Sequence, residues 1–159
     1  MAEDSKCEQI VQYWVDKFEA DDDVRVRYFK QVKRIRVKLA DIKNFSSKQL
    51  PLLAIVAGLP KPESHMKGRV SGGGDYFKTK LKVEFIVFGM DAVNPSATIL
   101  NIADDLWVTL QGDQLSGSGD TALTTEIDVV PEDIVYVVDP YFAFKMICTF
   151  TYYHTIGGI

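Results

Sequence analysis

The stretch Lys78–Gly89, KTKLKVEFIVFG, constrains the fold more than any other part of the chain. Its apolar residues recur with period two, which is the pattern of a β-strand. One face would carry Leu81, Val83, Phe85 and Val87. The opposite face begins with charge at Lys80, Lys82 and Glu84 and becomes apolar at Ile86 and Phe88. We therefore predict a central strand that is exposed on one face at its start and buried on both faces at its end.

A chain of 159 residues is long enough for one well-formed core, because a protein of this size buries about two-thirds of its unfolded surface. We predict a single domain over residues 1–159. No apolar run approaches the roughly 18 residues of a membrane span, and the acidic start MAEDSK is unlike a signal peptide. We expect no membrane partner and a cytosolic product.

Two segments carry apolar residues at the three- and four-residue steps of an amphipathic helix. The first runs from Ser5 to about Ala20, where Asp4 or Ser5 can cap the first turn. The second begins at Asn94-Pro95-Ser96 and stops at Gly112. Two helices can cover one face of a sheet, so the other face would remain available for assembly.

The other predicted elements are strands joined by polar loops, with alternation or short apolar runs as the signal. The candidate strands are Val24–Phe29, Lys33–Leu39, Gln49–Gly58, Thr124–Val130, Asp133–Val138 and a closing strand over Phe142–Tyr152. A helix over Phe29–Leu39 also fits, and Asp41–Gln49 resembles a loop. The closing strand is the natural antiparallel neighbour of the central strand. The predicted fold class is α+β, a mixed, mainly antiparallel β-sheet with two amphipathic helices on one face and long polar hairpin loops.

Leu59–Tyr76 contains two prolines, an isolated glycine and the triplet Gly72-Gly73-Gly74, with few apolar residues. A loop of this length inside a domain is usually functional or disordered. A phosphate-binding loop is a weak hypothesis, because no Gly-Lys-Ser/Thr follows and the strand comes after the glycines. We expect residues 61–76 to form an extended flexible hairpin or loop that contacts a neighbouring subunit or a partner. Gln114–Thr121 is a second polar linker.

The sequence offers no catalytic or cofactor-binding motif. His65 and His154 are far apart in the chain, and neither Cys7 nor Cys148 has metal-ligand or redox spacing. Asp104 and Asp105 fall on the outer side of the second helix, where we expect them to be solvated. We expect no catalytic residues, no metal and no cofactor. The net charge of −4 also argues against sequence-specific or general nucleic-acid binding.

A basic block follows an acidic one near the N-terminus. Lys30–Lys38 carries five basic residues, whereas Glu19–Asp23 is acidic. The block would dock electrostatically on another subunit or form a solvated edge strand. Tyr152, Tyr153 and His154 could line an interface rim or simply flank a strand end. The candidate interface residues are Lys33, Arg34, Arg36, Lys38, Lys67, Arg69, Tyr76, Tyr152 and Tyr153.

The order of these elements resembles that of the tail terminator, or tail-completion (neck), proteins of tailed bacteriophages. The segments that carry the resemblance are Gln49–Ile55, Leu81–Ala92, Ala97–Leu110 and Ala143–Tyr153. Together with the N-terminal helix and the polar hairpin they cover most of the chain. The resemblance is one of layout rather than of a short motif.

The resemblance implies a structural virion protein without enzymatic activity. Such proteins form a ring, commonly of six subunits, that binds the end of the tail tube, stops its polymerisation and offers a platform to the head connector. The implied partners are further copies of the chain, the tail tube protein and the head-tail connector protein. The implied location is the tail or neck of a virion assembled in the host cytoplasm. The alternatives are another tail-tube or head-completion subunit, or a small ligand-binding domain or enzyme that uses the glycine-rich loop.

Overall fold

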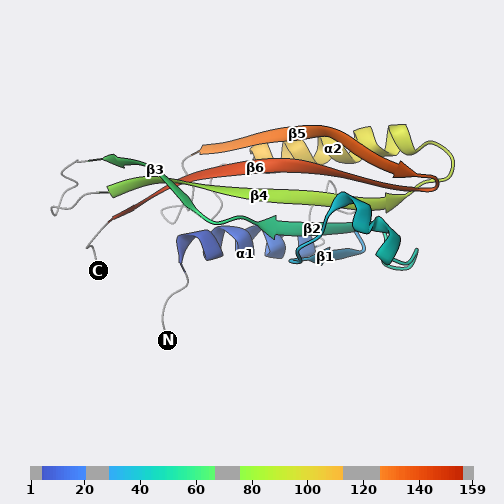
Figure 1. The fold of residues 1–159 in the computed structure, drawn as a ribbon, viewed down its shortest axis with the longest axis horizontal. Coiled ribbons are helices and arrows are strands. Elements are labelled where there is room, and N and C mark those ends of the chain that lie inside the picture. Colours follow the sequence, from blue (N-terminus) through green and yellow to red (C-terminus); the bar gives the residue numbers. More distant parts are fainter. Residues whose placement is uncertain (1–4, 21–28, 67–75, 113–125, 156–159) are drawn as a thin grey trace.

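The computed structural model describes residues 5–20, 29–66, 76–112 and 126–155, and shows an α+β fold built on one mixed sheet (Figure 1). The strand order is β1-β2-β4-β6-β5, with β3 paired to β4 outside this path. The elements in chain order are α1 (Lys6–Glu19), β1 (Gln31–Lys33), the 3-10 helix η2 (Leu39–Asn44), β2 (Leu52–Ala57), β3 (Lys61–Met66), β4 (Tyr76–Met90), α2 (Pro95–Gly112), β5 (Glu126–Val138) and β6 (Tyr141–Thr155). The predicted fold class is confirmed.

The centre of the sheet is the antiparallel pair β4 and β6. The two strands pair without a break over 15 residues, from Tyr76 opposite Thr155 to Met90 opposite Tyr141. Among the strands in the described part of the chain, only β1 and β2 pair in parallel. The central strand and its closing neighbour were both predicted correctly, because period-two alternation continues through each.

Both helices pack on the same face of this sheet, as predicted. Ile10, Trp14 and Phe18 of α1 and Ile102, Leu106 and Leu110 of α2 meet one continuous core. The sheet contributes the predicted face of β4 and the even-numbered residues of β6 from Phe142 to Tyr152. Trp14 stacks on Phe150 with ring centroids 5.9 Å apart and meets Phe85 edge-on at 6.4 Å.

Side chains cap the first turns of both helices, where backbone amides have no helical partner. Ser5 Oγ accepts a hydrogen bond from the Glu8 amide at 3.3 Å. Asn94 Oδ1 accepts one from the Ala97 amide at 3.2 Å, and Asp91 Oδ1 accepts from the amides of Val93 and Asn94. The Thr98 hydroxyl bond and these two amide bonds lower the pKa of Asp91. The predicted cap at Ser5 is confirmed.

The opposite face of the sheet is only partly open. A second, smaller core lies there, formed by Leu52 and Ala54 of β2, Ile86 and Phe88 of β4 and the segment that follows β1. In that segment Ile35, Val37 and Leu39 pack against the second core, as does Phe45, whose ring centroid is 4.9 Å from that of Phe88. The expectation that this whole face remains available is therefore wrong for its β2 side.

Three predicted boundaries differ from the structure. The strand over Lys33–Leu39 is wrong beyond Lys33, as is the alternative helix, because the alternating apolar side chains cover the second core instead of joining a ladder. η2 occupies part of the predicted loop Asp41–Gln49. The two strands expected on either side of Pro131 are one strand, β5, with an irregularity between Pro131 and Val135.

Leu59–Tyr76 was predicted to be a hairpin or loop, and the structure shows that its described ends pair as β3 and the start of β4. The polar linker Gln114–Thr121, most of the predicted strand Val24–Phe29 and the last four residues lie outside the described residues. Among the helices that are described, none has the length and apolarity to cross a membrane.

Candidate interaction surface

One end of the sheet forms a projecting arm. β3, the first residues of β4 and the last residues of β6 extend past both helices (Figure 1). The face of this arm opposite the helices carries a row of lysines, because even-numbered β4 residues point away from the helix-side core. We name Lys61, Lys78, Lys80 and Lys82 the lysine patch. Lys61 and Lys82 are exposed, and the other two are half-buried.

The lysine patch has threonines as its nearest β6 neighbours on the same face, and acidic residues lie one strand further away on β5, where Glu126 is opposite Thr151. On β6, Thr149 lies opposite Lys82, and Thr151 lies opposite Lys80. The exposed Asp128 of β5 is one strand further away, opposite Thr149. Glu84 is next along β4, but its carboxylate pairs with Lys145 at 3.4 Å. The lysines on this face therefore come from β3 and β4, and the acidic positions Glu126 and Asp128 come from β5.

Two members of the lysine patch are direct cross-strand partners, since Lys61 lies opposite Lys80. Like charges at such positions destabilise a sheet by a few tenths to about 1 kcal/mol. The exposed members of the lysine patch, Lys61 and Lys82, make it a candidate surface for an acidic partner.

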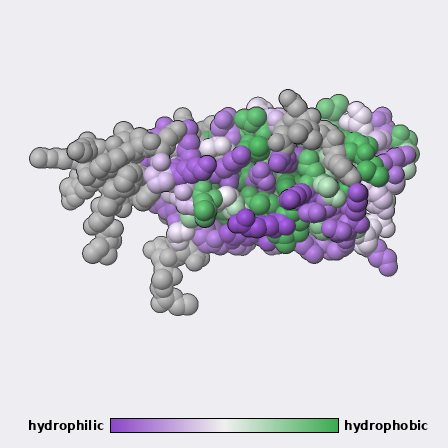
Figure 2. Space-filling model, viewed as in Figure 1, coloured by the Kyte–Doolittle hydropathy of each residue, from purple (hydrophilic) through white to green (hydrophobic). Residues whose placement is uncertain are grey.

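The other end of the molecule is more apolar. In Figure 2 hydrophobic residues lie in the middle of this face and at the end away from the arm, with hydrophilic residues among them. Exposed apolar side chains at the ends of β4 and β5 and in the following segment include Met90, Val93, Val137 and Val138. The molecule therefore presents two chemically different ends.

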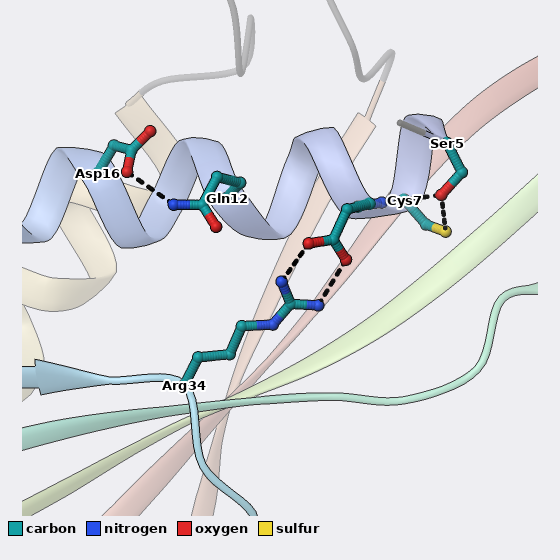
Figure 3. Close-up of polar contacts among 6 residues, drawn as sticks. Ser5, Cys7, Gln12, Asp16 and Arg34 are labelled. Atoms are coloured by element: carbon teal, nitrogen blue, oxygen red, sulfur yellow. Dashed lines mark hydrogen bonds and ion pairs between the residues drawn. The ribbon is translucent and has the colours of Figure 1, made fainter. Parts of the chain in front are cut away.

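The predicted basic block has a structural role through Arg34. Its guanidinium makes a bidentate pair with the Glu8 carboxylate, including a 2.7 Å bond from Nη2 to Oε2, and so ties the chain after β1 to the first turn of α1 (Figure 3). The hydrogen bond from Arg34, with its charge, lowers the pKa of Glu8. The pair is more than a third exposed, so its contribution to stability is modest, up to about 1 kcal/mol.

Replacing Glu8 by Gln is expected to lower the free energy of unfolding by no more than about 1 kcal/mol at pH 7. Because the folded-state pKa of Glu8 lies below its ordinary value, the pair stabilises the protein above that value and loses its effect as pH falls through the folded pKa. Urea unfolding of both proteins at several pH values between 7 and 3 would measure this.

Glu19→Gln is the matched control, since it removes the same charge from the exposed end of α1 without contacting Arg34. Its effect should lack the steep loss at acid pH. A difference between Glu8→Gln and wild type that persists unchanged at pH 3 would show that the ion pair is not its source.

The predicted interface residues are dispersed in the structure. Lys33 is half-buried in β1, whereas Arg36 and Lys38 are exposed beside the second core. Lys67 and Arg69 lie outside the described residues. Tyr76 and Tyr153 belong to the strands of the arm, and their side chains lie outside the described part. These residues do not form one described site.

Tyr152 was predicted at an interface rim, but it is buried, with 5% of its surface exposed. The even-numbered residues of β6 face the helix-side core, and Tyr152 continues that series beside Cys7 of α1. Burial, followed by the charge and hydrogen bonding of Cys7, raises the pKa of Tyr152 to about 12. Tyr152 is therefore a core residue and not a surface contact.

The lysine patch was missed as a site, although its signal is visible in the sequence. The alternation KTKLK at Lys78–Lys82 places three lysines on one face of a strand. Their clustering with Lys61 depends on the β3–β4 register, which the sequence does not state.

No protein-family model and no curated protein sequence matches this chain. Within residues 5–20, 29–66, 76–112 and 126–155, no group of three or more His, Cys, Asp or Glu residues is arranged to hold a metal ion. Cys148 is fully buried, and desolvation raises the pKa of its thiol.

Proposed function

We propose that this chain is a structural virion protein that forms a ring on the end of a phage tail tube, ends tube polymerisation and joins the tail to the head connector. It would act without a cofactor or catalytic residues, in a virion neck assembled in the host cytoplasm. Its partners would be further copies of itself, the tail tube protein and the connector protein. The layout of elements that resembles tail terminator proteins is the sequence basis of this proposal.

The observation that carries the proposal is the projecting arm with its lysine patch. A head-to-tail ring requires two different surfaces on one subunit, each complementary to the other. The arm is basic, whereas the opposite end of the sheet is apolar, so the chain has unlike surfaces at its two ends. A sheet edge that extends beyond the helices also offers reach toward a neighbour or a tube without disturbing the core.

The solution mass tests the proposal. We expect light scattering behind size exclusion to give a mass of about six chains of 17.9 kDa, either alone or after addition of tail tubes, at physiological salt. Added protein should also shorten growing tubes, which electron microscopy of negatively stained samples would measure.

Two results would contradict a terminator. Growth of the purified protein into open filaments would identify a tube subunit instead, because a head-to-tail contact that does not close polymerises. A monomer that stays monomeric with tubes present and leaves tube length unchanged would remove both structural hypotheses.

A further inference from the structure

The outer face of α2 differs from an ordinary solvated helix surface. α2 spans 18 residues and contains no Lys, Arg or His, although surfaces usually intersperse both signs of charge. Leu100 and Trp107 are 67% and 41% exposed, and the exposed Asp104 lies between them on the same side. Positions separated by three or four residues share one helix face. We name Leu100, Asp104 and Trp107 the α2 stripe.

The chemistry of the α2 stripe fits a lysine-bearing surface. A carboxylate attracts an ammonium group, and the face of an indole ring attracts a cation, with Trp the best of the aromatic side chains. The apolar side chain of Leu100 can contact the methylene stem of a lysine. The described surface presents a matching set of cations in the lysine patch, where two lysines are direct neighbours.

The two surfaces of one copy cannot meet each other. α2 packs on the helix side of the sheet, and the lysine patch is on the opposite face. Their placement on opposite sides suits contact between successive copies, which is heterologous and closes when the rotation per copy allows.

We infer that the lysine patch of one copy docks on the α2 stripe of the next copy, with lysine ammonium groups paired to Asp104 and lying over the Trp107 ring. Two copies that each carry a net charge of −4 repel each other overall, so the attraction in this contact comes from the local pairing of the lysine patch with the α2 stripe. This inference rests on the proposed function, since it names the contact that joins neighbouring subunits of the ring.

Charge reversal on both surfaces tests the contact. One variant carries Lys61→Glu and Lys82→Glu, and the other carries Asp104→Lys; all three positions are exposed. Each variant alone should associate at least about tenfold more weakly than wild type in sedimentation velocity, because close charge pairs across interfaces couple by that much or more. Mixed in equal amounts, the two variants should associate again, because the two new glutamates of one copy meet the new lysine on α2 of the other, and each unchanged surface also finds its complement.

The matched control is Lys43→Glu with Lys48→Glu, which changes the same number of exposed lysines beside η2. It should assemble like wild type, and circular dichroism should show all variants folded. Trp107→Ala should weaken association without any change of charge, which separates the cation-ring contact from net charge.

Three outcomes would overturn the inference. Reversed variants that still form rings would remove this contact and leave the terminator proposal standing. Rings that form but fail to bind tubes would assign the lysine patch to the tube rather than to a second copy. Wild type that stays monomeric in the presence of tubes would remove both the contact and the proposed function.

Discussion

Replacing Phe85 by Ala is expected to lower the free energy of unfolding by about 3–5 kcal/mol, the usual cost of deleting a fully buried aromatic ring. Phe85 lies at the middle of β4 with none of its surface exposed. Its ring meets those of Trp14 and Phe18 at 6.4 and 5.8 Å, so it joins α1 to the sheet. The loss removes burial and also two aromatic contacts.

Urea unfolding followed by tryptophan fluorescence would measure this loss, because Trp14 contacts the deleted ring. Leu59→Ala is the control, since Leu59 is 81% exposed and should change stability by less than about 0.5 kcal/mol. If the alanine variant does not fold, Phe85→Leu gives a smaller and measurable loss at the same position. Equal stability of Phe85→Leu and wild type would show that the α1 contact is not formed as described.

Gly89→Ala is expected to destabilise the protein by about 1–3 kcal/mol or more, because no space exists for a methyl group at this position. A Cβ atom there would lie 2.2 Å from Cζ of Phe142, and two further ring carbons would be within 2.8 Å. The two residues are direct register partners in β4 and β6, and the buried Phe142 ring covers the glycine.

A double-mutant cycle separates this clash from a general weakness of β4. Phe142→Ala alone should cost about 3–5 kcal/mol through the cavity it leaves. Adding Gly89→Ala to it should cost less than in wild type, because the ring that clashed is gone, and the coupling should be about 0.5–3 kcal/mol. Additive losses would contradict the contact. Thermal or urea unfolding of the four proteins provides the measurement.

The elements that sequence reasoning found are those with a sustained period. α1, α2, β4 and β6 each repeat their apolar spacing over four or more steps, and each lies within two or three residues of its predicted bounds. Short irregular segments were not found. The alternation of Ile35, Val37 and Leu39 is that of a strand, yet these side chains pack on the second core without a ladder partner. Tertiary contacts determine the conformation of this segment, and the spacing of its apolar residues does not reveal those contacts.

The candidate surface was predicted less well than the fold, for a physical reason. The basic block is visible as a run of charge, but Arg34 turned out to hold α1 through Glu8. The lysine patch joins residues 61 and 80, which are separated by a long segment and become neighbours only through strand pairing. Register is set by the hydrophobic faces of several strands together, so it cannot be read from one of them.

The continuous 15-residue pairing of β4 with β6 limits which mutations can alter the lysine patch without disturbing the core. Because one strand carries core residues on one face and the lysine patch on the other, inserting or deleting a single residue near its middle would exchange the faces of everything beyond that point. Substitutions can therefore change the charge of the lysine patch, whereas an insertion or deletion in β4 would also disrupt the core. The spacing of the lysines along β4 is therefore fixed by the core packing of Leu81, Val83 and Phe85 on the opposite face of the strand.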